Sequence, residues 1–159
     1  MWNVPLLGLL TLLYAAYNFF VKVSSQYVSN QTSTTILLTI TVQLAALAFS
    51  ALFLGYLFSR GGHNFGVTGT AVAWSAGAGF AIGAAEVCYF YLFTGLGGYP
   101  PAPANVVIPT VVTGTVILSM LAGIAFLGEA AGWRQLLGAL LVVSGILVLF
   151  SGGRAAAGP

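Results

Sequence analysis

Five long apolar runs take up most of this chain, and they limit what it can fold into more than any other feature. They cover residues 4–23, 34–58, 67–93, 104–127 and 133–150. A helix needs about 20 mostly apolar residues to cross a bilayer, and each run is of about that length. Only helices and closed barrels satisfy every backbone polar group in hydrocarbon, and the runs lack the alternation of barrel strands. They therefore predict five transmembrane helices.

The segments between the runs contain the residues that end helices. Polar residues fill "SSQYVSNQTST", while "SRGGHNFG", "TGLGGYPPAPAN" and "GEAAG" are rich in glycine or proline. Neither residue type continues a helix easily. We expect an all-α membrane protein in which residues 1–159 form a single five-helix bundle, with residues 151–159 as a tail.

Composition supports a membrane location and excludes several functions. Of the 159 residues, 59% are hydrophobic and 4% are charged, whereas a soluble domain is about a quarter charged. We expect a multi-pass integral protein of a plasma or inner membrane, surrounded by lipid. The four basic residues are scattered, so nucleic acid is not an expected partner; they are Lys22, Arg60, Arg134 and Arg154.

Catalytic and metal-binding motifs are missing from the sequence. The chain has one cysteine and one histidine, which is too few for a thiolate or histidine metal cage, and we expect no metal or cofactor. It has no GxxxxGK[ST], HExxH or GxSxG pattern, so nucleotide hydrolysis and the familiar intramembrane hydrolytic chemistries lack their parts. We do not expect an enzyme.

One carboxylate, Glu86, interrupts the apolar run "GFAIGAAEVCYFYLF". A charged side chain at the centre of a bilayer costs about 2.5–3.5 kcal/mol on the insertion scale. Lys22 could pair with Glu86, because the first and third spans run in the same direction and both residues lie in the later half of their spans. Alternatively the carboxyl stays protonated until water or solute reaches it. Either way Glu86 is a candidate for proton coupling or for holding a cationic group.

A purely structural interpretation of these two residues is also open. Glu86 could be a protonated carboxyl that only bonds a neighbouring helix. Lys22 lies near a helix end, where a lysine can extend its ammonium to the headgroups.

Polar side chains form stripes on the first three predicted spans. With about 100° of rotation per residue, these side chains fall on one face of each helix. In a bilayer such faces turn toward each other or toward a wet cavity, although interhelical hydrogen bonds worth about 0.6 kcal/mol each would also explain them. We expect the substrate or proton pathway to include Glu86, Lys22, Asn18, Tyr14 and Gln43.

Small residues recur at every fourth position of the third span, in the same arc as Glu86. They are Ala71, Ser75, Gly79 and Gly83. Small residues let helix backbones approach closely in lipid, so we expect Ser75, Gly79 and Gly83 to pack against another helix.

Aromatic side chains gather near the end of the third span, at Tyr89, Phe90, Tyr91 and Phe93. They could line a pocket for an organic solute. Aromatics near a helix end more often form a belt at the membrane surface, and we favour the belt for most of them.

The segment from Val106 to Phe150 resembles the EamA-like repeat of the drug/metabolite transporter superfamily. Three features carry the resemblance: a proline early in the fourth span, an "LGE" sequence that ends it, and a glycine-spaced last helix. These are Pro109, Leu127 to Glu129, and Gly138 with Gly145. The segment "YNFFVKVSS" is also similar to the end of the family's first helix, with Lys22 at the customary basic position.

The resemblance implies a half-transporter, because most of the superfamily has two such five-helix units of opposite orientation in one chain. The small multidrug resistance branch resembles this chain less, since its carboxylate lies in helix one, and Glu86 does not inherit that role. Pro109 interrupts a helix and is expected to act as a hinge bordering the binding site, although a static bend filled by packing would also explain it. Glu129 is expected to accept bonds from free N–H groups at the start of the fifth span.

Loop charges predict how the units assemble. Arg60 and Arg134 fall on one side of the membrane, and Lys22 and Arg154 on the other. Basic residues in loops set orientation, so this balance predicts an antiparallel homodimer inserted both ways; the alternatives are a parallel dimer or a heteromer. The expected function is secondary transport of a small metabolite or drug-like solute, and the alternative is a non-transporting scaffold or partner subunit.

Overall fold

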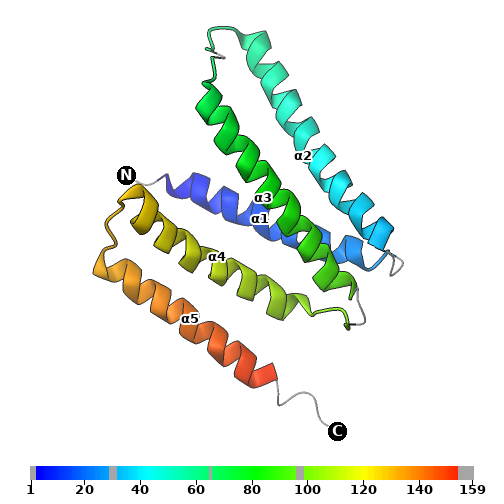
Figure 1. Ribbon diagram of the computed structural model, residues 1–159, viewed down its shortest axis with the longest axis vertical. Coiled ribbons are helices and arrows are strands. Elements are labelled where there is room, and N and C mark those ends of the chain that lie inside the picture. Colours follow the sequence, from blue (N-terminus) through cyan, green and yellow to red (C-terminus); the bar gives the residue numbers. More distant parts are fainter. Residues whose placement is uncertain (1–2, 29–31, 65, 96–98, 154–159) are drawn as a thin grey trace. The chain divides into compact units, whose positions relative to one another are not determined.

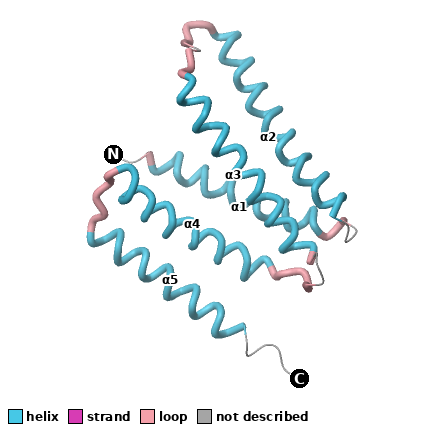
Figure 2. Tube along the Cα trace, in the orientation of Figure 1, coloured by secondary structure: helices cyan, strands magenta, loops and turns pink. Residues whose placement is uncertain are grey.

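The computed structural model describes residues 3–28, 32–64, 66–95 and 99–153, and every regular element in these ranges is an α-helix. The helices are α1 (Val4–Ser25), α2 (Thr32–Arg60), α3 (Gly69–Thr94), α4 (Ala104–Leu127) and α5 (Trp133–Gly153). Figure 1 shows them in chain order, and Figure 2 marks the loops that join them. The all-α prediction is confirmed for the described residues, and each helix end lies within three residues of its predicted position.

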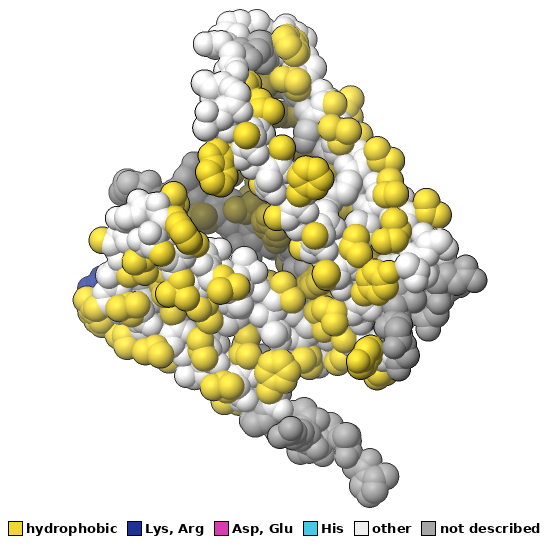
Figure 3. Space-filling view, in the orientation of Figure 1, with side chains coloured by type: hydrophobic (Ala, Val, Ile, Leu, Met, Phe, Trp, Pro, Cys, Tyr) yellow, Lys and Arg dark blue, Asp and Glu magenta, His cyan; other side chains and the backbone are white. Residues whose placement is uncertain are grey.

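Four of the helices, α1 to α4, have the length and hydropathy needed to cross a membrane. In α5 the apolar stretch Trp133–Val148 is shorter, so a fifth span stays a prediction. Many large hydrophobic side chains are exposed on these helices, and Figure 3 shows them spread over the visible face. Exposed apolar surface on this scale requires a nonpolar surrounding, which makes the chain a multi-pass membrane protein.

The chain divides into two compact units, Met1–Pro101 and Ala102–Pro159. We call the helices α1 to α3 the three-helix unit, and α4 with α5 the hairpin unit. The prediction of one five-helix domain stays a prediction.

In the three-helix unit, α3 contacts both α1 and α2. Figure 1 shows α2 and α3 as an antiparallel pair, with α1 crossing α3. Local sequence sets the helix ends: Pro5 occupies the first turn of α1, where its missing N–H costs nothing. The Thr68 side chain accepts a hydrogen bond from the N–H of Ala71 at the start of α3. Gly95 ends α3 in the left-handed conformation, with φ of 73°.

The core of the three-helix unit lies at one end of it. The buried residues belong to the later parts of α1 and α3 and the first turns of α2. They are Val21, Ser25, Thr35, Thr39, Glu86, Tyr89, Phe90, Phe93 and Thr94. This core is half polar, unlike the apolar core of a soluble protein, because the lipid-facing exterior already takes the apolar side chains.

In the hairpin unit, α4 and α5 pack against each other. The turn between them begins at Gly128, which has φ of 67°, a conformation that favours glycine. The N–H of Glu129 donates to the carbonyl of Gly123 at 3.1 Å and closes the end of α4. Pro109 lies inside α4, where it removes the donor that would reach the carbonyl four residues earlier. Its role as a hinge stays a prediction.

Candidate functional site

Glu86 lies in the core of the three-helix unit with only 4% of its surface exposed. Its side chain projects from α3 toward α1, where the Tyr17 hydroxyl donates a hydrogen bond to Oε1. The second carboxyl oxygen, Oε2, is buried and has no hydrogen-bond partner among the described residues. A buried polar atom without a partner loses hydrogen-bonding free energy. Glu86 therefore keeps the capacity to take up one more donor.

A second polar contact joins the same two helices one turn further on. The Tyr89 hydroxyl of α3 donates to Asn18 Oδ1 of α1 at 3.1 Å. The Tyr89 ring also packs on Phe93, with 4.9 Å between ring centroids. These contacts hold the two helices together directly beside Glu86.

Lys22 makes the third contact. Its Nζ lies 4.8 Å from the centroid of the Phe93 ring, within the distance at which an ammonium is attracted to an aromatic face. Tyr17, and not Lys22, donates to Oε1 of Glu86, and a pair between Lys22 and Glu86 stays a prediction.

The order of these contacts gives the relative direction of the helices. Positions 17, 18 and 22 of α1 meet positions 86, 89 and 93 of α3 in ascending order. Two helices joined in this order run in the same direction, although their axes cross. The expectation that the first and third spans run in the same direction is confirmed.

The structure brings some predicted site residues together and leaves others apart. Glu86, Asn18 and Lys22 all belong to the α1–α3 contact. Tyr14, one turn earlier on α1, is 60% exposed, and Gln43 is half-buried further along α2. No hydrogen bond between described residues joins Tyr14 or Gln43 to Glu86, and their place in the pathway stays a prediction.

The predicted small-residue ridge of α3 is open. Ser75 and Gly79 are exposed, and a Cβ built at Gly79 or Gly83 would meet no atom within 4 Å. The described helices therefore do not use the ridge for close packing, and its packing role stays a prediction.

Sequence reasoning missed Tyr17 and assigned the wrong role to three aromatics. Tyr17 lies three residues after Tyr14, so it shares a helical face with the predicted stripe, and this spacing was the signal that could have found it. Tyr89, Phe90 and Phe93 are buried, so the belt interpretation is wrong for them. They fill the contact with α1 because the helices meet at this end.

Glu129, the other acidic side chain, is arranged differently. Its Oε2 lies beside Gly123, where an added Cβ would come within 2.6 Å of it. The N–H of Gly132, near the start of α5, donates to Gln135 Oε1 at 2.7 Å and not to Glu129. Within the described ranges, no group of three His, Cys, Asp or Glu side chains could hold a metal ion.

Comparisons with known proteins assign no family. No protein-family model, no curated protein and no solved structure matches the chain. The class of the protein is therefore assigned from its own fold and site. The chain is an all-α, multi-pass membrane protein with a carboxyl group buried between two helices that run in the same direction.

Proposed function

We propose that the chain is one subunit of a secondary transporter for a small metabolite or drug-like solute. One observation carries the proposal: Glu86 is buried between α1 and α3 with one carboxyl oxygen bound by Tyr17 and the other without a partner among the described residues. Ionisable residues inside membrane helices are costly, at about 2.5–3.5 kcal/mol, and commonly mark proton relays or solute sites. Glu86 would bind the coupling proton or a cationic group of the solute.

The resemblance to the drug/metabolite transporter superfamily supports the same proposal. It rests on Pro109, the "LGE" sequence Leu127 to Glu129 and the glycines of the last helix. In that superfamily the five-helix unit is half of a transporter. The number of apolar helices in this chain is compatible with one such unit.

A single unit needs a second one to enclose a solute path. The basic residues are balanced across the predicted spans, with Arg60 and Arg134 opposed to Lys22 and Arg154. Without a bias in the loops, insertion has no preferred direction. We therefore propose an antiparallel homodimer, with a parallel dimer or a heteromer as the alternatives.

The competing function is a scaffold or partner subunit that moves no solute. The polar contacts between α1 and α3 favour it, since Tyr89–Asn18 and Tyr17–Glu86 would stabilise a purely structural helix pair. The open oxygen of Glu86 favours the transporter, because a residue kept only for packing gains nothing from an unsatisfied buried atom.

The test uses the chain's two acidic side chains as a matched pair. A screen for thermal stabilisation first selects a binding metabolite, because a ligand of the folded state raises apparent stability. Its flux is then measured in proteoliposomes containing only this protein. We expect Glu86→Gln to lower the flux at least about tenfold, the loss expected of an essential intramembrane carboxyl, and Glu129→Gln to preserve it.

Two results would contradict the proposal. Unchanged flux and pH dependence in Glu86→Gln would remove Glu86 from the mechanism. If the unmodified protein moved none of the stabilising metabolites, the scaffold or partner-subunit function would be the remaining candidate.

A further inference from the structure

The helix pair α1 and α3 is packed at one end only. After Glu86 the buried residues of α3 are Tyr89, Phe90, Phe93 and Thr94, and before Glu86 no residue of α3 is buried. The buried residues of α1, Val21 and Ser25, likewise come after Tyr17. Glu86 therefore lies at the boundary between a packed and an unpacked part of the same contact.

The packed end consists largely of aromatic rings. We call Tyr89, Phe90 and Phe93 the aromatic seal. Phe90 is fully buried, the Tyr89 ring packs against Phe93 at an angle, and the Lys22 ammonium lies over the Phe93 ring. Side chains that interlock in this way leave no room for water, so the seal separates Glu86 from the side where α1 and α3 end.

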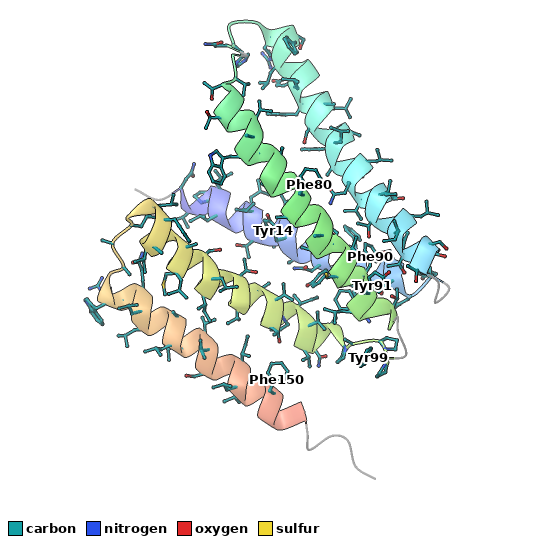
Figure 4. All side chains as sticks on the ribbon, in the orientation of Figure 1. Tyr14, Phe80, Phe90, Tyr91, Tyr99 and Phe150 are labelled. Carbon is teal, nitrogen blue, oxygen red and sulfur yellow. The ribbon has the colours of Figure 1, made fainter. Side chains whose placement is uncertain are left out.

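The facing surfaces continue beyond Glu86 toward the helix starts, but there the two helices part. Tyr14 lies one turn before Tyr17 on the same side of α1, and it is 60% exposed. Gly83 and Gly79 lie one and two turns before Glu86, and a Cβ at either would touch nothing within 4 Å. Figure 4 labels Tyr14 on α1 and Phe80 on α3.

We propose that water and solute reach Glu86 only from the side where α1 and α3 begin, along the face of Ser75, Gly79 and Gly83, while the aromatic seal closes the other side. This inference rests on the proposed function and names the side from which Glu86 is reached. The buried Oε2 of Glu86 lacks a donor, and water arriving along this face supplies one. Small and polar side chains line the route, whereas lipid contact favours large apolar ones.

Access from the other side requires the seal to open. The contacts Tyr89–Asn18 and Lys22–Phe93 must then break, because they join α3 to α1 between Glu86 and the ends of these helices. A transporter alternates between two such states. The structure is in the state in which α1 and α3 are packed together at their C-terminal ends.

Cysteine accessibility in the full-length chain tests the route without measuring transport. In a Cys88→Ser background, single cysteines replace Gly79 and Gly83 on the route, Phe80 as a control, and Val21 beside the seal. Phe80 is matched in depth to Gly79 and is 82% exposed, on a different face of α3. Open membrane fragments, in which the reagent reaches both surfaces, are treated with a positively charged, impermeant methanethiosulfonate. The labelling rates of the four cysteines are then compared.

We expect the cysteines at positions 79 and 83 to react at least about tenfold faster than those at 80 and 21, because only a hydrated thiol ionises readily. Rates at 79 and 83 as slow as that at 80 would mean that lipid or protein fills the route and would overturn the proposal. Fast labelling at Val21→Cys would overturn the seal. Since labelling needs no solute, a failed flux assay with this labelling pattern would reject the transport function alone.

Discussion

The two acidic side chains of the protein lie in regions of opposite character. Glu86 is buried in the three-helix unit, between α1 and α3, and accepts a hydrogen bond from Tyr17. Glu129 is exposed in the connector of the hairpin unit and lies beside Gly123. The same chemical group is thus buried between two helices in one region and exposed at a helix terminus in the other. Its surroundings, and not its identity, determine what it can do.

The contacts between helices differ in the same way. In the three-helix unit, polar side chains reach across to another helix, as Tyr89 does to Asn18. In the hairpin unit, the described hydroxyl groups of Thr110, Thr115 and Ser144 bond to carbonyls of their own helices. Side-chain hydrogen bonds therefore specify how α1 meets α3, whereas the α4–α5 pair relies on its short connector and on apolar packing.

The largest expected difference between the regions is at the two glycines that end α3 and α4. Both have positive φ, 73° at Gly95 and 67° at Gly128. A Cβ at Gly95 would lie 2.6 Å from the carbonyl oxygen of Tyr99, whereas one at Gly128 would meet nothing within 4 Å. Gly95→Ala adds a backbone clash to conformational strain and should lower the free energy of unfolding by about 3 kcal/mol. Gly128→Ala should lower it by about 1 kcal/mol.

Unfolding in mixed micelles with rising fractions of denaturing detergent measures both variants. Gly138→Ala serves as the control, because this glycine lies inside α5 with open space around its Cα and its replacement should be neutral or stabilising. Equal losses at Gly95 and Gly128 would show that the crowded backbone after α3 is not a constraint.

The next expected effect concerns the two carboxylates. Glu86→Ala leaves the half-buried Tyr17 hydroxyl without its acceptor and should cost about 1 kcal/mol, the lower end of the range for a donor left without a partner. Glu129→Ala changes an exposed side chain and should alter stability by less than about 0.5 kcal/mol. The same detergent titration compares them, and a larger loss at Glu129 would reverse the comparison.

A double-mutant cycle sharpens the assignment of Glu86's partner. Tyr17→Phe with Glu86→Ala should show a coupling of about 1 kcal/mol, within the range measured for hydrogen bonds between membrane helices. The cycle of Lys22→Met with Glu86→Ala should show less, because Nζ lies over Phe93. A larger coupling for Lys22 would support the ion pair with Glu86 that the sequence allows.

The smallest expected effect compares single hydroxyl groups in the two units. Tyr89→Phe removes the bond to Asn18 and should cost about 0.6 kcal/mol, the average for a polar contact between membrane helices. Ser144→Ala removes a bond within α5 and should cost close to nothing, because no second helix is involved. Similar losses for the two variants would mean that the contact between α1 and α3 is no stronger than a bond within one helix.

The sequence predicted the helices and several members of the site. Long apolar runs and the glycines and prolines between them act locally, so helix ends such as Ala104 and Leu127 follow from the sequence. Helical spacing placed Asn18 and Lys22 on one face, and the parallel direction of α1 and α3 follows from counting spans. These are properties of single helices and of their order, which the bilayer restricts to few possibilities.

Only the tertiary structure decided which side chains meet. A polar face covers a wide arc of a helix, and a small rotation or change of crossing angle exchanges one partner for another. Glu86 therefore meets Tyr17, and Lys22 meets Phe93, although the sequence permitted a Glu86–Lys22 pair. The crossing of α1 and α3 also decided that Tyr89 and Phe90 are buried while Tyr14 is exposed, because helices that touch at one end cover only the side chains at that end.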